Sequence, residues 1–376
     1  MLSAMYAAAA RRRRERYAAR PDLRRRLRRP VISVGNLAVG GRGKTPMVAA
    51  VVRELLAMGE RPAILSRGYA RTDAVDGVVV VRDPAGIRGD LGRSGDEPLM
   101  LARGLDGASV LVCPDRYLAG CLAERRLDAT VHVLDDGFQH LQLERDVDIL
   151  IVGHDDIANP ATLPRGRLRE PLDTLIAADA IVAADDDVEI DVRGMEIPIF
   201  RVTRALGAPV FAGWKPEGPP KPASDPGRSV THATPSGRVL EPPTRVAALA
   251  GIASPAKFFD DLRRAGYSLV ETLAFADHHP YSAKDVRRIF ARAAGAGATA
   301  LLTTEKDFVR LLPHRPFPMR SGWVPLTMEP APPGDFRRWL AESLGAARDM
   351  IPNFESRISS PEPRGPSREP RVPNRG

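Results

Sequence analysis

The strongest constraint on the fold is a series of short apolar segments separated by helix-length stretches. The segments are "VISVG", starting at Val31, then "PAILSRGY", "DGVVVVRD", "SVLVCPD", "ATVHVLDD", "VDILIVG" and "DAIVAAD". Runs that are apolar on both faces and alternate with helices indicate a parallel sheet covered on both sides. We therefore expect an α/β fold with a mostly parallel sheet. Ligands bind such sheets at the carboxyl ends of the strands.

The same pattern divides the 376 residues into segments. We expect a basic arm (1–30), a first α/β domain (31–205), a connector rich in proline and glycine (206–243), a second, smaller α/β domain (244–346) and a disordered tail (347–376). The last expected helix is "GDFRRWLAESLGAAR", which this division assigns to the smaller domain.

Composition excludes several classes of protein. A hydrophobic content of 43% with 27% charged residues is typical of a soluble globular chain. A run of about 18 apolar residues, which a transmembrane helix needs, does not occur. The two cysteines, Cys113 and Cys121, give neither a disulfide framework nor a metal-ligand pattern.

The basic charge is concentrated in the arm. Residues 11–30 hold eleven arginines against Glu15 and Asp22, whereas the whole chain has a net charge of +8. The rest is therefore nearly neutral and gives no argument for a nucleic-acid partner. The arm is a solvated tail, a nucleic-acid tail or an interfacial membrane anchor. We favour the anchor, in which arginines pair with anionic lipid headgroups beside Met1, Leu2, Met5, Tyr6, Tyr17, Leu23 and Leu27.

A glycine-rich loop follows the first expected strand. "GNLAVGGRGKTP" has the GK[ST] end of a phosphate loop, but Ala38 stands where the usual pattern has its first glycine. Gly40, Gly41 and Gly43 allow backbone N–H groups to turn towards an anion at a helix N-terminus. Lys44 is expected to reach the β- and γ-phosphates of a nucleotide, and Thr45 to place its hydroxyl on Mg²⁺. The alternative is a glycine-rich turn.

A second strand supplies a candidate carboxylate for magnesium. "VHVLDDGFQH" ends an apolar run with Asp135 and Asp136. In a doubly wound sheet a carboxylate at this strand end lies near Thr45. The alternative is a helix cap or a solvated turn. Together with the glycine-rich loop, the pattern favours a metal ligand at Asp135.

Longer motifs resemble one family. They occur in the order "GNLAVGGRGKTP", "LSRGYAR", "SGDEPLMLA", "VLDDGFQHLQLERDVDILIV", "LPRGRLREPL", "LAGIASPAKFFDDLRRAG", "FADHHPYS" and "LLTTEKDFVRL". The series resembles the tetraacyldisaccharide 4′-kinase family of lipid A synthesis in Gram-negative bacteria, over about residues 31–312. That resemblance implies a P-loop kinase that uses ATP and Mg²⁺. It also implies an acylated glucosamine disaccharide 1-phosphate as acceptor, at the cytoplasmic face of the inner membrane.

The resemblance also implies roles for single residues. Asp96 matches the family's proposed catalytic base, and His278 matches its partner histidine, although His279 leaves the choice of ring open. An ordinary aspartate, with a pKa of about 3.9, is a weak base unless a partner tunes it. The alternative is that Asp96 caps a helix and His278 is a surface residue.

Six further positions complete the candidate site. Glu170 of "LREP" is implied to join Asp135 around magnesium, and Arg169 to steady the transferring phosphate; the alternative is a surface ion pair. We expect Gln139 and His140 to line the cleft. Arg67 and Tyr69 are expected to face the lipid headgroup, with loop packing as the alternative.

The competing class is a nucleotide-driven switch or metallochaperone with a related phosphate-loop fold. A guanine-specific switch carries [NT]KxD, whereas "TTEKDF" has Lys306 and Asp307 adjacent. A metallochaperone needs a Cys/His ligand cluster, for which "DHHP" alone is thin support. The kinase interpretation accounts for more of the motifs.

Overall fold

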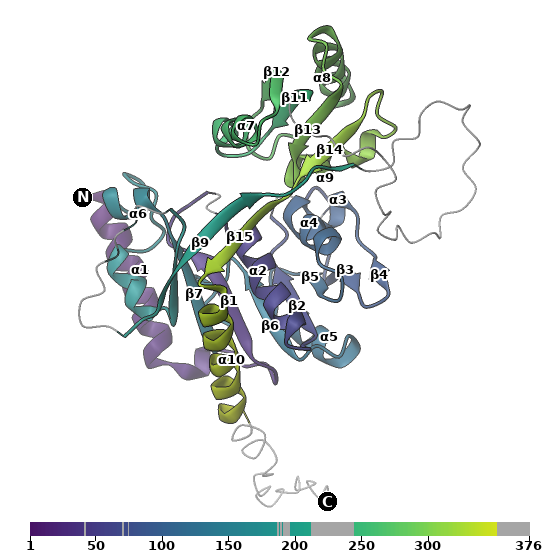
Figure 1. Ribbon diagram of the computed structural model, residues 1–376. Coiled ribbons are helices and arrows are strands. Elements are labelled where there is room, and N and C mark those ends of the chain that lie inside the picture. Colours follow the sequence, from purple (N-terminus) through teal and green to yellow (C-terminus); the bar gives the residue numbers. More distant parts are fainter. Residues whose placement is uncertain are drawn as a thin grey trace, which may run out of the picture.

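Two sheets organise the molecule (Figure 1). The computed structural model describes residues 1–40, 43–69, 71–73, 75–185, 188, 190, 196–211 and 244–351. Of the predicted segments, most of the connector and residues 352–376 of the tail lie outside these ranges. The expected α/β class, with a mostly parallel sheet and a second, smaller sheet, is confirmed.

Within the described residues the large sheet has the order β15-β9-β8-β7-β1-β6-β2-β5-β3-β4. The strands from β9 to β5 are parallel, and the two edges are antiparallel. Their bounds are β1 Val31–Asn36, β2 Pro62–Ser66, β3 Val79–Asp83, β4 Gly86–Ile87, β5 Ser109–Val112, β6 Val131–Asp135, β7 Val147–Val152, β8 Ala180–Ala183, β9 Ile199–Leu206 and β15 Leu326–Ala331.

Helices cover both faces of this sheet, as its doubly apolar strands require. One face packs on α2 (Lys44–Ala57), α4 (Asp96–Gly104) and α10 (Pro333–Met350), and the other on α5 (Arg116–Arg126). The other elements of this part are α1 (Leu2–Ala19), η1 (Pro21–Leu23), α3 (Leu91–Ser94), α6 (His154–Ala158) and η2 (Leu172–Ala177).

The smaller sheet has the order β10-β14-β13-β11-β12 within the described residues. Its strands are β10 Val210–Phe211, β11 Arg245–Ala250, β12 Ser268–Ala274, β13 Ala300–Thr304 and β14 Ser321–Val324. Its helices are α7 Pro255–Arg264, α8 Ala283–Gly295, α9 Glu305–Leu311 and η3 Leu312–His314. Apolar residues of α7 and α8 are buried in its two core clusters.

The smaller unit ends earlier than the sequence suggested. After β14 the chain returns to the large sheet, where β15 pairs antiparallel with β9. The next helix, α10, buries Phe336, Leu340 and Leu344 in the core of the large sheet. The division at 244–346 therefore differs from the structure, because residues 326–350 belong to the large sheet and its cover. The tail boundary also shifts, since Ala347 is buried and α10 extends to Met350.

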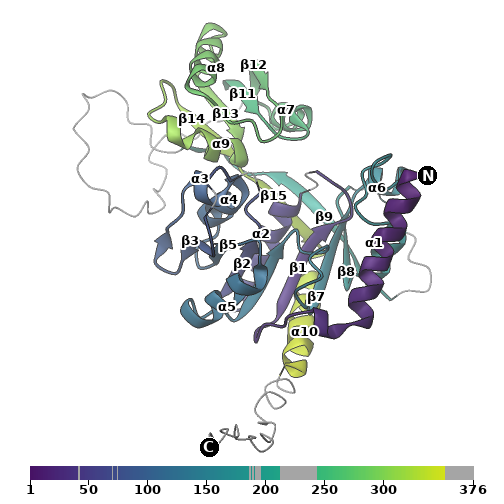
Figure 2. The same ribbon diagram turned by 180° about the vertical axis from the view of Figure 1, so that it is seen from behind.

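The arm forms a helix that lies on the large domain (Figures 1 and 2). The helix α1 ends at Ala19, and Pro21 begins η1. Thr162 donates its hydroxyl proton to the backbone oxygen of Ser3, at 2.8 Å. Leu27 is buried in a core cluster with residues of α5. Several arm arginines pair with carboxylates: Arg11 with Asp173, Arg14 with Glu170, Arg20 with Asp22, Arg25 with Asp115, and Arg26 with Glu144 and Asp146.

Phe336 tests whether α10 is integral to the large domain. Its ring is 1% exposed and lies edge-on to Phe200, with 5.1 Å between ring centroids. We expect Phe336→Ala to lower the free energy of unfolding by about 3–5 kcal/mol, because it leaves a cavity in the core. Arg338→Ala is the control, since that side chain is 70% exposed. Equal denaturant midpoints for the two variants would show that α10 is dispensable.

Candidate functional site

The glycine-rich loop lies between β1 and α2. Gly40 and Gly43 have φ angles of +97° and +77°, which favour glycine. A Cβ at Gly43 would also overlap the Met328 sulfur on β15. The third predicted glycine, Gly41, lies outside the described residues. The two described glycines therefore have the backbone freedom that an anion-binding loop needs.

Lys44 begins α2, and its side chain reaches back over the loop. Its Nζ lies 3.2 Å from the Gly40 carbonyl oxygen, 3.3 Å from Oδ1 of Asn36 and 3.8 Å from Oδ1 of Asp136. Thr45 is the next residue and is half-buried. Asn36 was not predicted. It is fully buried, and its Nδ2 has no hydrogen-bond partner among the described residues.

The two adjacent aspartates differ in their surroundings. Asp135 ends β6 and is buried, and Ser66 donates a 3.3 Å hydrogen bond to it. Burial, together with the charges of Glu97 and Asp136, raises the pKa of Asp135 to about 7. A cation beside Asp135 would offset this burial of negative charge, so the residue fits a metal ligand.

Asp136 is held by Arg169. The guanidinium donates hydrogen bonds of 2.9 and 2.7 Å to the two carboxylate oxygens. Burial alone would raise the pKa of Asp136, but Arg169 and Lys44 outweigh burial and lower it. Arg169 also donates to Oδ1 of Asn36, at 2.6 Å. The predicted Arg169 therefore lies at the loop, beside Lys44.

Glu170 faces another direction. It accepts a 2.8 Å hydrogen bond from Arg14 of α1, whose guanidinium stacks 4.4 Å above the Phe138 ring. Burial raises the pKa of Glu170 although Arg14 opposes the shift. Asp135 and Glu170 thus have different partners in this structure. Among the described residues, no group of three or more His, Cys, Asp or Glu side chains could hold a metal ion.

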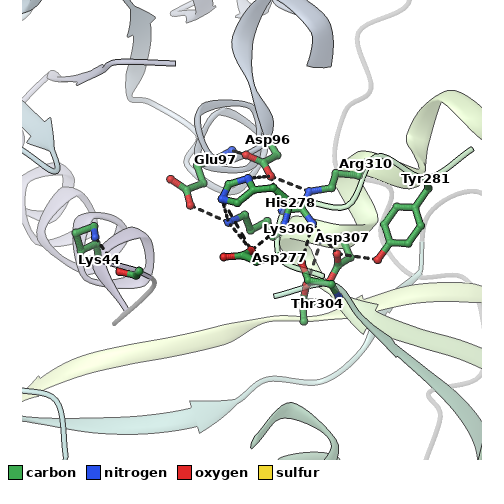
Figure 3. Close-up of polar contacts among 12 residues, drawn as sticks. Lys44, Asp96, Glu97, Asp277, His278, Tyr281, Thr304, Lys306, Asp307 and Arg310 are labelled. Atoms are coloured by element: carbon green, nitrogen blue, oxygen red, sulfur yellow. Dashed lines mark hydrogen bonds and ion pairs between the residues drawn. The ribbon is translucent and has the colours of Figure 1, made fainter. Parts of the chain in front are cut away.

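Asp96 and His278 meet across the two units (Figure 3). Asp96 is the first residue of α4 and is buried, whereas His278 lies in the loop between β12 and α8. The His278 Nδ1 atom is 3.1 Å from Asp96 Oδ2, an ion-pair distance without the alignment of a hydrogen bond. His278 has a φ of +60°, a strained conformation typical of functional sites.

The neighbouring ring has another partner. His279 lies 3.3 Å from Asp285, which caps α8 together with Ser282. His278, not His279, therefore forms the predicted pair with Asp96.

Two cations of α9 complete the cluster, and sequence reasoning missed their role. Arg310 donates from Nε and Nη2 to Asp96 Oδ2, at 2.7 and 2.5 Å. Lys306 lies 3.0 Å from both Glu97 Oε1 and His278 Nε2. Both residues belong to "LLTTEKDFVRL", which serves above as a family motif and in the test for guanine specificity, with no site role for either residue. Their four-residue spacing, which puts two cations on one helix face, was the available signal.

The remaining predicted residues border these groups. The exposed Tyr69 ring lies edge-on to His278, with 5.2 Å between ring centroids. Arg67 is also exposed. Gln139 donates to the Asn36 carbonyl oxygen at 3.0 Å, which places it at the loop. Burial and the charge of Arg116 lower the pKa of His140 to about 4, so this ring is neutral at pH 7.

Comparisons with known proteins agree with this geometry. The family model described as tetraacyldisaccharide-1-P 4′-kinase matches residues 1–345. The chain belongs to this kinase family. The match starts in the arm, which lies outside the range of the sequence motifs.

Members of the tetraacyldisaccharide 4′-kinase family from several bacteria are similar to this chain. The Geobacter sulfurreducens protein of that name is 41% identical over 316 residues, which cover 83% of each chain. The Koribacter versatilis protein is 38% identical over 316 residues, covering 81% of this chain and 87% of the relative. The crystal structure of "apo" form LpxK from Aquifex aeolicus in complex with ATP has a TM-score of 0.70. It is 27% identical and covers 91% of this chain and 97% of that chain.

Proposed function

We propose that this chain transfers the γ-phosphate of ATP to the 4′-hydroxyl of a tetraacyldisaccharide 1-phosphate in lipid A synthesis. Family membership supports the reaction class. The observation that carries the proposal is the pairing of Asp96 with His278 between two units, one of which also holds the phosphate loop. In this arrangement the nucleotide binds at the loop of one unit, and the acceptor lies where the two units meet.

The loop residues bind the nucleotide in this proposal. Backbone N–H groups at Gly40, Gly41 and Gly43 face the phosphates, and Lys44 and Arg169 neutralise their charge. Thr45 and Asp135 hold Mg²⁺, which supplies further charge neutralisation when bound. Glu170, which is paired with Arg14 through Oε2 in the structure, is the third predicted ligand.

The acceptor side needs a group that removes a proton. As the 4′-oxygen forms its bond to the γ-phosphorus, the bond from phosphorus to the ADP oxygen breaks and the hydroxyl proton must leave. In the proposal Asp96 takes that proton, and His278 orients its carboxylate. Tyr69, Arg67, Gln139 and His140 contact the sugar headgroup, which the position of Tyr69 against His278 supports.

Transfer of label tests the function. Purified protein with radiolabelled ATP and a tetraacyldisaccharide 1-phosphate acceptor should give labelled lipid. Lys44→Ala should abolish that label and leave the fold intact, because Lys44 neutralises phosphate charge. Lys284→Ala, at an exposed position on α8, is the matched control. Undiminished labelling by Lys44→Ala would remove the loop from the mechanism.

A double-mutant cycle on kcat tests the pair. Asp96→Ala should lower kcat by about 10²–10⁴ with little change in the KM for ATP, which is the range for a positioned base. His278→Ala should lower kcat less, and His279→Ala should act only on the cap of α8. If the pair works as a unit, the double variant is scarcely slower than Asp96→Ala. Strictly multiplicative losses would mean that the two residues act independently.

We also propose that the arm holds the protein at the cytoplasmic face of the inner membrane. Within the described part of the chain, every helix falls short of the length and apolarity that crossing a bilayer requires. Exposed apolar residues gather at the start of α1: Met1, Leu2, Met5 and Tyr6. Because several of the eleven arginines pair with carboxylates, fewer than eleven can contact lipid. The exposed candidates include Arg12, Arg16 and Arg28.

Binding to vesicles tests whether the exposed arginines of the arm contact lipid. Changing Arg12, Arg16 and Arg28 together to Gln should weaken binding to anionic vesicles by about two orders of magnitude, at about 1 kcal/mol per charge. Arg20→Gln is the control, because Arg20 is paired with Asp22. Cosedimentation at low salt measures the effect. Equal binding by the triple variant and the wild type would argue against the arm as the anchor.

A further inference from the structure

The two cations of α9 form a clamp on α4. Lys306 and Arg310 are four residues apart, so they project from one face of the helix. They meet two consecutive carboxylates at the start of α4, since Lys306 pairs with Glu97 and Arg310 with Asp96. We call Lys306 and Arg310 the α9 clamp. The contact of Arg310 with Asp96 is buried, with each side chain 5% exposed, whereas the Glu97 side chain is 31% exposed.

Besides its contact with Asp96, Arg310 is held by hydrogen bonds within the smaller unit. Its Nη1 donates to the Gly251 carbonyl oxygen at 2.8 Å and to Asp307 Oδ1 at 2.9 Å. Asp307 is fully buried and accepts hydrogen bonds from Tyr281 and Thr304 (Figure 3). The guanidinium is therefore anchored on one edge and presents its other edge to Asp96. Both bonds of this fork end on Oδ2, so Arg310 fixes the place of that oxygen.

Lys306 determines which ring nitrogen of His278 carries the proton. Burial would lower the pKa of Lys306, but the carboxylates of Glu97, Asp96 and Asp277 outweigh burial and raise it. A protonated lysine only donates hydrogen bonds. The His278 Nε2 atom, 3.0 Å from Nζ, must therefore accept, and the single ring proton resides on Nδ1, which faces Asp96.

We propose that Lys306 and Arg310 are positioning residues for the phosphoryl transfer, which orient Asp96 and select the His278 tautomer only while the smaller unit is docked on α4. This inference rests on the proposed function and adds to it two residues that act through Asp96 and His278. A buried ion pair is a poor way to gain stability, because its desolvation offsets its attraction. We therefore assign the buried ion pair to the orientation of Asp96 and not to stability.

The clamp makes the activity depend on pH in a defined way. The charged groups around Asp96 are Glu97 on its own helix, Asp277 and His278 in the loop between β12 and α8, and Lys306 and Arg310 on α9. Burial would raise the pKa of Asp96, but His278, Lys306 and Arg310 outweigh it and hold the pKa well below its usual range. Removal of the Arg310 charge must raise this pKa. The acidic limb of kcat then moves to higher pH, since Asp96 must be ionised.

Arg310→Gln and Arg310→Lys test the fork. Arg310→Gln should lower kcat by about 10²-fold, as small misplacements of reacting groups do, with the KM for ATP unchanged within about twofold. Its acidic limb should lie at higher pH than that of the wild type. Arg310→Lys keeps the charge and should restore the limb and part of kcat. Arg292→Gln is the matched control, an exposed arginine of the same unit paired with Glu271.

The ¹⁵N NMR spectrum of His278 gives a readout that does not need turnover. Lys306→Met should allow the Nε2-protonated tautomer, which the wild type excludes, and lower kcat by about tenfold. The proposal is overturned if Lys306→Met retains the wild-type tautomer. It is also overturned if Arg310→Gln has the same kcat as Arg292→Gln. A third contrary outcome is a lower kcat in Arg310→Gln whose acidic limb stays at the wild-type pH and which Arg310→Lys does not restore. If the wild type labels no lipid, the proposed function fails. The NMR comparison of the His278 tautomer in the wild type and in Lys306→Met still tests the role of the α9 clamp, because it does not need turnover.

Discussion

The parallel pairing of β1 with β6 determines where the chemistry of this protein lies. The register sets Val34 opposite Asp135, so the end of β6 lies beside the start of the glycine-rich loop. The neighbouring pairing of β2 with β6 adds Ser66 to the same edge. The backbone pairing of the strands therefore brings Asp135 and Asp136 to the glycine-rich loop, where Lys44 lies.

Two buried carboxylates of the site, Asp135 and Asp96, differ in how their negative charge is compensated. At the loop, Asp135 is buried without a cation in ion-pair contact among the described residues, and its pKa is raised to about 7. At α4, Asp96 is equally buried but meets Arg310 and His278, and its pKa is lowered. The first carboxylate suits an incoming cation. The second is already compensated by the protein itself, which matches a role at the acceptor rather than at the metal.

Local patterns predicted what depends on local physics. The apolar runs identified six parallel strands, namely β1, β2, β5, β6, β7 and β8, and also β3, which is antiparallel to β5. The GKT sequence identified the loop and the start of α2. The pairing of β15 with β9 joins residues about 120 positions apart and leaves no local signal, so the last helix was assigned to the wrong unit. The same limit hid Arg310, which lies 214 positions from Asp96. Glu170 was predicted from a family motif, and only the folded arm shows its contact with Arg14.

The return of β15 to β9 has a topological consequence. The chain leaves the large sheet after Leu206 and re-enters it at Leu326, and the Gly207 N–H donates to the Pro325 carbonyl oxygen at 2.8 Å. The two strands are thus a β-hairpin in which an entire folded unit replaces the turn. Because the ends of the insert are already neighbours, the register of the large sheet is independent of what the insert contains. Insert and host are therefore joined by a paired hairpin at one place and meet again where α9 contacts α4.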